Sequence, residues 1–181
     1  MKQINGSHEE GYRQLPEYCR DLEKNNPGSV IDLCTTNDGR FQRVFICLAA
    51  ASTGFVYCRP LLGLDSSHIK TAYHGVLLTA TSVDALGQLF PVAYAIVDAE
   101  TKENWYWFVE NLRKSLSPRI PSIFNTPNAL TILSDRQKGL LEAVIRELPN
   151  AAHGYCLRHL EANFLKHFKH PELRPLLWKA A

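Results

Sequence analysis

One stretch in the second half of the chain constrains the fold more than any other. It is Ala129-Leu-Thr-Ile-Leu-Ser-Asp-Arg-Gln-Lys-Gly139, where a short apolar run ends on a carboxylate and a helical pattern begins at once. Continuous apolar runs are typical of strands in parallel sheets, and open α/β sheets place their chemical groups where strands lead into helices. The pattern therefore predicts that Asp135 lies at the tip of a strand, at a functional edge.

A second acidic residue, Asp65, also follows an apolar run, Leu61-Leu-Gly-Leu. Asp is disfavoured within strands, so its place between Leu64 and Ile69 requires a reason. Metal ligation is one, because Mg²⁺ and Mn²⁺ prefer hard oxygen ligands. The alternatives are a helix N-cap for Asp135 and a strand-edge or turn position for Asp65. We expect the two carboxylates to hold Mg²⁺ or Mn²⁺.

Composition places the chain among ordinary globular domains. It has 181 residues, of which 45% are hydrophobic and 21% charged, enough to bury a core. The net charge of +2 is too small to indicate nucleic-acid binding by itself, although five of the twenty Lys and Arg follow His153. The five cysteines lie in apolar or amphipathic stretches, as reduced core thiols do. With no apolar segment long enough for a secretory signal or a membrane helix, we expect an intracellular protein.

Hydrophobic periodicity predicts three strands in a meander, followed by helix, strand, helix, strand and helix. The strands are expected at 61–70, 75–84, 89–98, 130–134 and 153–156, and the helices at 103–116, 137–148 and 157–168. Upstream, the pattern predicts a packing helix from residue 12 to a stop at 25–28, and then a strand at 29–34. Residues 41–58 are apolar without a clear period and fit either a strand or a short helix.

This order predicts an α/β fold of the ribonuclease H-like type, a mixed five-stranded sheet with flanking helices. A right-handed crossover returns the fourth strand parallel to the first, and neighbouring strands lie about 4.8 Å apart. Asp65 and Asp135 should then converge at one edge of the sheet. On the helix at 103–116, Trp105 belongs to the core, whereas Trp107 lies on another face and either covers a second element or faces an absent domain.

Six motifs in one order resemble the transposase domain of Mutator-like elements (MULE). The resemblance spans roughly residues 26–168, and several motifs in register are more specific than any one of them. They are Cys-Arg-Pro-Leu-Leu-Gly-Leu-Asp-Ser-Ser-His-Ile-Lys (58–70), Tyr-His-Gly-Val-Leu-Leu-Thr-Ala (73–80), Gln-Leu-Phe-Pro-Val-Ala-Tyr-Ala (88–95), Asn-Trp-Tyr-Trp-Phe (104–108), Leu-Ser-Asp-Arg-Gln-Lys-Gly (133–139) and Tyr-Cys-Leu-Arg-His-Leu (155–160).

The resemblance implies a DDE-type transposase core in which Asp65 and Asp135 match the first two acidic ligands. His68 matches the family's Asp-Gly-Thr-His motif, where Ser66-Ser67 replaces Gly-Thr, and Cys156 and His159 match its Cys-x-x-His signature.

The family's third acidic residue follows a long helical insertion beyond that signature, whereas this sequence stops at Ala181. We therefore expect a helical lead-in at 1–28, a MULE transposase domain at 29–168, and the start of a truncated insertion at 169–181.

Cys156 and His159 also form half of a Cys/His zinc site, to which His153 adds a third candidate. The sequence offers no evident fourth ligand. The favoured interpretation is structural, with Cys156 packed and His159 near the acidic site or its DNA.

Three basic residues, Arg136, Lys138 and Arg158, are positioned to meet DNA phosphates beside the metal site, although simple solvation is the alternative for each. Two acidic residues, Glu142 and Glu161, lie near enough in sequence to be considered as the missing ligand. We expect both to lie on solvated helix faces instead.

The functional hypothesis is therefore the central part of a nuclear DDE-type DNA transposase that performs two-metal cleavage and strand transfer on transposon ends and target DNA. Lacking the third carboxylate, the 181 residues alone are expected to be inactive, so whether they act as an enzyme stays undecided. The alternative is a domesticated or decayed transposase that binds DNA or protein without catalysis. A ribonuclease H-type nuclease would need a fuller acidic cluster. Association into a homo-oligomer stays open.

Overall fold

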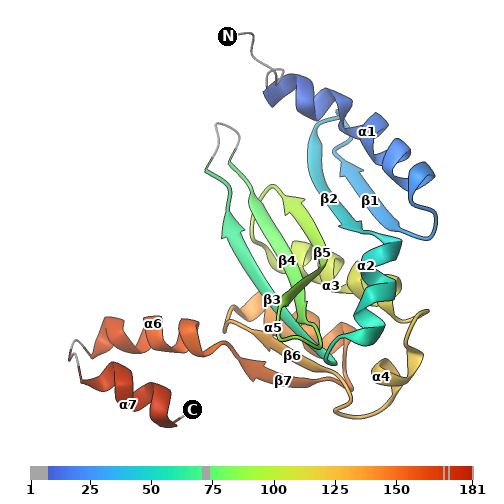
Figure 1. Cartoon of the computed structure of the whole chain (residues 1–181). Coiled ribbons are helices and arrows are strands. Elements are labelled where there is room, and N and C mark those ends of the chain that lie inside the picture. Colours follow the sequence, from blue (N-terminus) through green and yellow to red (C-terminus); the bar gives the residue numbers. More distant parts are fainter. Residues whose placement is uncertain (1–7, 71–73, 169, 171, 181) are drawn as a thin grey trace.

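A seven-stranded mixed sheet runs through the part of the chain that the structure describes (Figure 1). The computed structural model describes residues 8–70, 74–168, 170 and 172–180. The strand order is β1-β2-β5-β4-β3-β6-β7. The strands are β1 (Val30–Thr35), β2 (Phe41–Cys47), β3 (Leu61–His68), β4 (Val76–Val83), β5 (Leu89–Val97), β6 (Thr131–Ser134) and β7 (Ala152–Tyr155).

Helices fill most of the connections between the strands. They are α1 (His8–Asn25), α2 (Ala49–Gly54), the 3₁₀ turn η1 (Phe55–Tyr57), α3 (Lys102–Leu116), α4 (Pro121–Asn125), α5 (Lys138–Glu147), α6 (Leu157–His167) and α7 (Leu173–Ala180). Every strand and helix predicted from periodicity is present to within a few residues. None of the described helices is long and apolar enough to cross a membrane.

The prediction of five strands was wrong, because the N-terminal hairpin β1–β2 joins the same sheet. β2 pairs antiparallel with β5 and so extends the meander by two strands. The ambiguous segment 41–58 holds both alternatives, since β2 is followed at once by α2 and η1. A window that spans a strand and a helix has no single period, which explains the missing signal.

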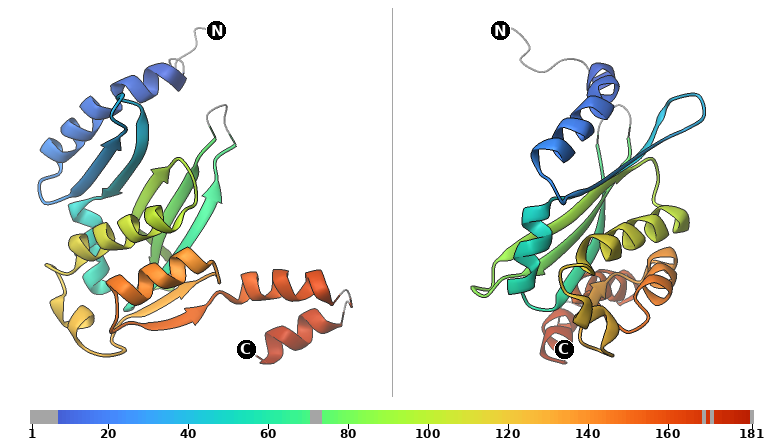
Figure 2. Two further views of the ribbon diagram at one scale, coloured as in Figure 1. Left: turned by 180° about the vertical axis from the view of Figure 1, so that it is seen from behind. Right: turned by 90° about the vertical axis from the view of Figure 1, so that its right-hand side faces the viewer.

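The central prediction, that the first strand of the meander lies beside the fourth of the five expected strands, is confirmed. β3 lies between β4, with which it is antiparallel, and β6, with which it is parallel. The helices α3 and α5 pack on one face of the sheet, whereas α1 lies on the other face near β1 and β2 (Figure 2). The core under α3 and α5 includes Leu62, Leu64, Leu78, Ala80, Phe108, Leu112, Leu140 and Val144.

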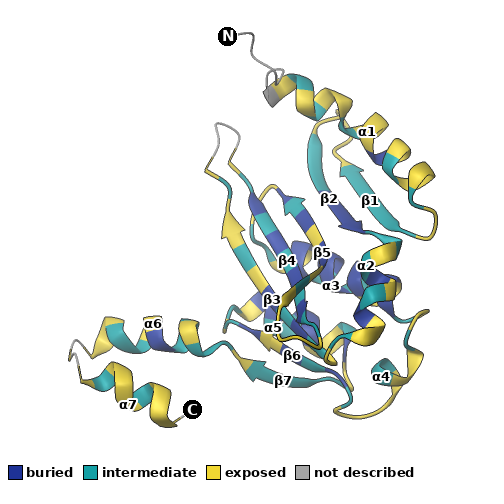
Figure 3. Cartoon of the chain, in the orientation of Figure 1, coloured by how far each residue is buried: buried dark blue, intermediate teal, exposed yellow. Residues whose placement is uncertain are grey.

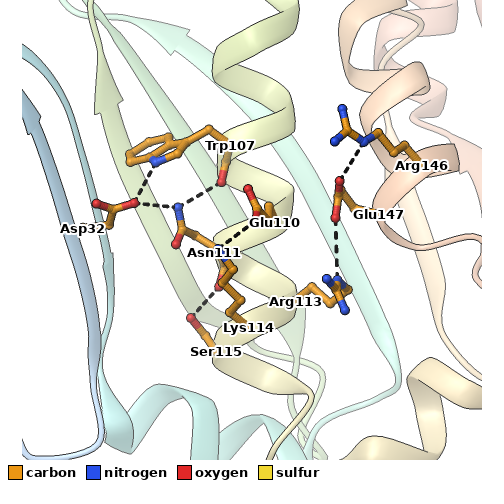
Figure 4. A network of polar contacts seen from close by, with 9 residues as sticks. All are labelled: Asp32, Trp107, Glu110, Asn111, Arg113, Lys114, Ser115, Arg146 and Glu147. Atoms are coloured by element: carbon orange, nitrogen blue, oxygen red, sulfur yellow. Dashed lines mark hydrogen bonds and ion pairs between the residues drawn. The ribbon is translucent and has the colours of Figure 1, made fainter.

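A buried polar network fastens the N-terminal hairpin to α3 (Figure 4). The Asp32 carboxylate on β1 accepts hydrogen bonds from the Trp107 indole at 2.7 Å and the Asn111 amide at 3.1 Å. The Arg43 guanidinium of β2 lies 4.5 Å from the centre of the Trp107 ring. Trp107 thus covers a second element, the β1–β2 hairpin, while Trp105 lies in the core with 1% of its surface exposed.

The C-terminal helices α6 and α7 project away from the sheet (Figure 1), and much of their surface is exposed (Figure 3). Phe168 and Trp178 are about half exposed, at 55% and 49%. Helical spacing in the sequence places Phe168 on the apolar stripe of its helix and predicts that it is buried, which is wrong because α6 extends away from the sheet and its neighbour is α7 (Figure 1). The same spacing predicts that Ile145 of α5 is buried, yet it is 69% exposed.

Candidate carboxylate site

The register of β3 and β6 places Asp65 and Asp135 at corresponding positions of two neighbouring strands. The last pair in the ladder between these parallel strands is Leu64 opposite Ser134, so the next residue on each is an aspartate. Neighbouring strands lie about 4.8 Å apart, and successive side chains alternate between faces. Leu64 and Ser134 are buried, whereas Asp65 is exposed and Asp135, one residue past the end of β6, is half-buried.

Asp65 keeps most of its carboxylate available. Its side chain is 60% exposed, and the hydrogen bond to it comes from the next amide, with Ser66 N donating to Asp65 Oδ1 at 2.9 Å. The imidazole of His159 approaches from the first turn of α6, with Nε2 at 4.0 Å from the same oxygen. His159 therefore lies beside Asp65, one of the two predicted acidic ligands.

Asp135 is half-buried and held by the start of α5 rather than capping it. Gln137 is the N-cap residue, and its side chain accepts from Leu140 N at 2.6 Å. Asp135 Oδ1 accepts instead from Gln137 N at 2.9 Å, a short turn that orients the carboxylate. The alternative interpretation of Asp135 as the N-cap residue was wrong. Its carboxylate does not cap α5 and is available for another role.

Gly139 explains part of the same motif through packing. A Cβ atom at this position would lie 2.9 Å from Lys102 Cα, so α5 approaches the start of α3 more closely than any side chain would allow. This contact fixes the first turn of α5, which in turn fixes the amide that binds Asp135.

Beneath the carboxylates, Ser134 is fully buried and contacts β7. Its hydroxyl oxygen lies 2.8 Å from Nε2 of His153 and donates to the Asp135 carbonyl at 2.8 Å. Burial lowers the pKa of His153 below its usual 6.5 and favours the neutral imidazole. The sequence analysis assigned Ser134 no role and considered His153 only as a zinc ligand.

The candidate zinc residues are distributed differently from a ligand cluster. Cys156 is the N-cap residue of α6 with a free thiol, His159 faces Asp65, and His153 contacts Ser134. Within the described ranges, no group of three or more His, Cys, Asp or Glu side chains is close enough to hold a metal ion.

The basic residues predicted to meet DNA are all exposed. Arg136 and Lys138 flank the start of α5, and Arg158 lies on the first turn of α6. The Arg136 guanidinium carbon lies 6.0 Å from the centre of the Tyr155 ring at the end of β7. His68, at the other end of β3 from Leu61, is also exposed.

The two acidic residues considered as a third ligand have cationic partners. Glu142 pairs with Lys102, and this hydrogen bond lowers the pKa of Glu142. Glu161 pairs with Arg174 of α7. The expectation that Glu161 lies on a solvated face was wrong, since it is only 7% exposed and a buried carboxylate requires such a partner.

The chemistry of this donor set fits a divalent ion of the magnesium type. Mg²⁺ keeps several waters and is commonly bound by one or two carboxylates. Asp65 and Asp135 supply two such groups, and each carboxylate has one oxygen that accepts a hydrogen bond from a nearby backbone amide.

The structure is a mixed α/β sheet with Asp65 inside β3, Asp135 directly after β6, and the Cys-x-x-His helix α6 after β7. The family model described as "MULE transposase domain" matches residues 61–163. That match covers more than half of the chain, and the chain belongs to the MULE transposase domain family. The resemblance seen in the sequence is thus confirmed.

The chain is also similar to proteins of Arabidopsis thaliana. It is 25% identical over 163 residues to "Protein FAR-RED IMPAIRED RESPONSE 1", covering 90% of this chain and 19% of the relative. It is 24% identical over 143 residues to "Protein FAR1-RELATED SEQUENCE 6", covering 79% and 19%. The chain therefore spans about a fifth of the length of these relatives.

Proposed function

We propose that this chain is the central part of a DDE-type DNA transposase, in which Asp65 and Asp135 hold Mg²⁺ or Mn²⁺ for cleavage and strand transfer. The strands β5-β4-β3-β6-β7 support the ribonuclease H-like assignment, because their order and directions are those expected for that fold. The hairpin β1–β2 is then an addition at the β5 edge.

The observation that carries this proposal is the placement of the two aspartates. They directly follow the Leu64–Ser134 pair of two adjacent parallel strands, with Asp65 inside β3 and Asp135 just past the end of β6. Two carboxylates on adjacent strands are a donor set that divalent ions of the magnesium type commonly use, with water completing the coordination.

When bound, a pair of such ions activates a water or 3′-hydroxyl and stabilises the leaving oxygen of a phosphodiester. The residues of this chain would hold the ions and orient the DNA. Gln137 N keeps Asp135 aimed, and Ser66 N does the same for Asp65. The exposed cations Arg136, Lys138 and Arg158 would position transposon ends or target DNA through phosphate contacts. With DNA as the proposed partner, the proposed location is the nucleus.

The described residues supply two acidic ligands, and the proposal expects these 181 residues to be catalytically silent by themselves. Removing one member of a group that acts as a unit costs orders of magnitude in rate. The test incubates the purified chain with labelled duplex DNA and Mn²⁺, beside Asp135→Asn. Equal, background nicking by both is expected. Nicking that Asp135→Asn abolishes would overturn this part of the proposal and show that Glu142 or Glu161, released from its cation, completes the site.

A second candidate is a transposase-derived module that binds DNA or protein without catalysis. It is favoured by the relatives, which are named for an impaired response to far-red light rather than for transposition. The two candidates differ in what Asp135 does. If the chain is a binding module, Asp135→Asn leaves the DNA affinity unchanged or slightly higher, both in Mg²⁺ and in EDTA. If it is part of a transposase, Mg²⁺ raises the DNA affinity of the native chain, and Asp135→Asn removes this increase. Filter binding with both buffers separates them.

A further inference from the structure

The buried hydroxyl of Ser134 links the strand that carries Asp135 to the strand beside it. Ser134 is 0% exposed, and its Oγ lies 2.8 Å from two groups, the Asp135 carbonyl and His153 Nε2. The backbone repeats this link, because Cys156 N donates to the Ser134 carbonyl at 2.7 Å. The last residue of β6 is thus tied to β7 twice.

The proton count assigns a direction to these contacts. A serine hydroxyl has one hydrogen and can accept as well as donate. Its hydrogen goes to the Asp135 carbonyl, which can only accept, so Ser134 must accept from His153. His153 Nε2 therefore carries the proton, and the neutral ring favoured by burial leaves Nδ1 as an acceptor.

The contact matters because β6 is short. It has four residues and ends at Ser134, so the backbone of Asp135 is outside the ladder that fixes the strand. Besides the Ser134 hydroxyl, the Gln137 amide holds Asp135 by donating to its carboxylate. A ligand whose backbone can shift does not keep the orientation that metal binding needs. Residues that do not touch the metal commonly fix this orientation through hydrogen bonds to the ligand.

We propose that His153 is a positioning residue for Asp135, acting through the Ser134 hydroxyl to hold the tip of β6 in the geometry that a divalent ion needs. This rests on the proposed function for its purpose but not for its geometry. The chain from His153 Nε2 to Ser134 Oγ to the Asp135 carbonyl exists whether or not an ion binds.

Two measurements on the whole chain test the geometry without any metal. Nitrogen NMR of histidine-labelled protein should show His153 in the Nε2–H tautomer. Amide exchange should show Gln137, whose N–H binds the Asp135 carboxylate, exchanging faster in His153→Ala than in the native chain. His153→Gln, which keeps a donor at the position of Nε2, should restore slow exchange. An Nδ1–H tautomer, or a Gln137 rate that His153→Ala leaves unchanged, would overturn the proposal.

The third measurement is Mn²⁺ affinity by electron paramagnetic resonance. His153→Ala should weaken binding about tenfold and His153→Gln should recover it. His167→Ala removes an exposed histidine, and Val44→Ala weakens the core at the other end of the sheet; both should keep the native affinity. A Val44→Ala loss equal to that of His153→Ala would reduce His153 to a general structural role and contradict the proposal.

A failure of the proposed function can be distinguished from a failure of the positioning role of His153. If the unaltered chain binds no Mn²⁺, or binds it equally well as Asp135→Asn, the metal site is wrong, while the tautomer and the Gln137 exchange still decide whether His153 holds Asp135.

Discussion

Two regions of this molecule use aspartate in opposite ways. At the N-terminal hairpin, Asp32 accepts hydrogen bonds from Trp107 and Asn111 on a single oxygen, within a network that joins β1 to α3 (Figure 4). At the other side of the sheet, Asp65 is 60% exposed and receives the amide of its own neighbour, Ser66.

The difference distinguishes a structural carboxylate from a candidate ligand. A half-buried carboxylate is stable when protein donors satisfy it, and Asp32 has such donors from a distant element. Asp65 and Asp135 each accept a hydrogen bond from a backbone amide one or two residues further along the chain, which orients the carboxylate but does not neutralise its charge. Hydrogen bonds from a distant helix or strand therefore identify an aspartate that stabilises the fold, which residue type alone does not.

The largest effect should come from removing the aromatic centre of the hairpin network. Trp107 is 8% exposed and packs edge-on against Phe45 with ring centres 6.2 Å apart. Trp107→Ala should cost about 3–5 kcal/mol of unfolding free energy. Trp178→Ala, at a half-exposed tryptophan of α7, should change it by less than about 0.5 kcal/mol. Urea unfolding monitored by circular dichroism measures both, and equal losses would contradict the contrast between the two regions.

A smaller effect should follow from exchanging the aspartates themselves. Asp32→Ala leaves the Trp107 and Asn111 donors without their acceptor, at a cost of about 1–3 kcal/mol. Asp65→Ala removes an exposed carboxylate and should leave stability within about 0.5 kcal/mol of the native value. The melting temperatures of the two variants test this comparison. A larger loss of stability in Asp65→Ala than in Asp32→Ala would contradict it.

The sequence predicted the part of this architecture that local patterns encode. Alternation and helical stripes located the meander and the helices around it, and the crossover rule placed β3 beside β6. The motif residues Asp65 and Asp135 followed from apolar runs that end in a carboxylate. Each of these signals lies within one segment of the chain.

Features built from distant segments could not be predicted in the same way. Asp32 and Trp107 are 75 positions apart, and neither signals the other. The burial of Glu161 depends on Arg174, which lies on a different helix, α7. A weak signal did exist for His153, since a histidine within a short apolar strand commonly has a buried partner, but the partner, Ser134, became evident only with the register of β6 and β7.

The smallest expected effect concerns pH at the His153 contact. Burial lowers the pKa of His153 below 6.5, so between 6.5 and the folded value the unfolded chain binds more protons. Stability contributed by the neutral imidazole is therefore complete above about pH 6.5 and declines as the pH falls below it. Melting temperatures of His153→Gln should decline less than those of the native chain between pH 6.5 and 5. A steeper decline in the variant would reverse the sign and contradict the assignment.

The central claim is that Asp65 and Asp135 together hold a divalent ion, and titration calorimetry with Mn²⁺ tests it most directly. The native chain should bind Mn²⁺ weakly, because two carboxylates and water hold an ion without enclosing it. The double variant Asp65→Ala, Asp135→Ala should show no measurable binding. Its matched control, Asp21→Ala, Asp38→Ala, removes the same charge from two exposed aspartates elsewhere and should bind as the native chain does. Unchanged Mn²⁺ affinity in the Asp65, Asp135 variant would contradict the account.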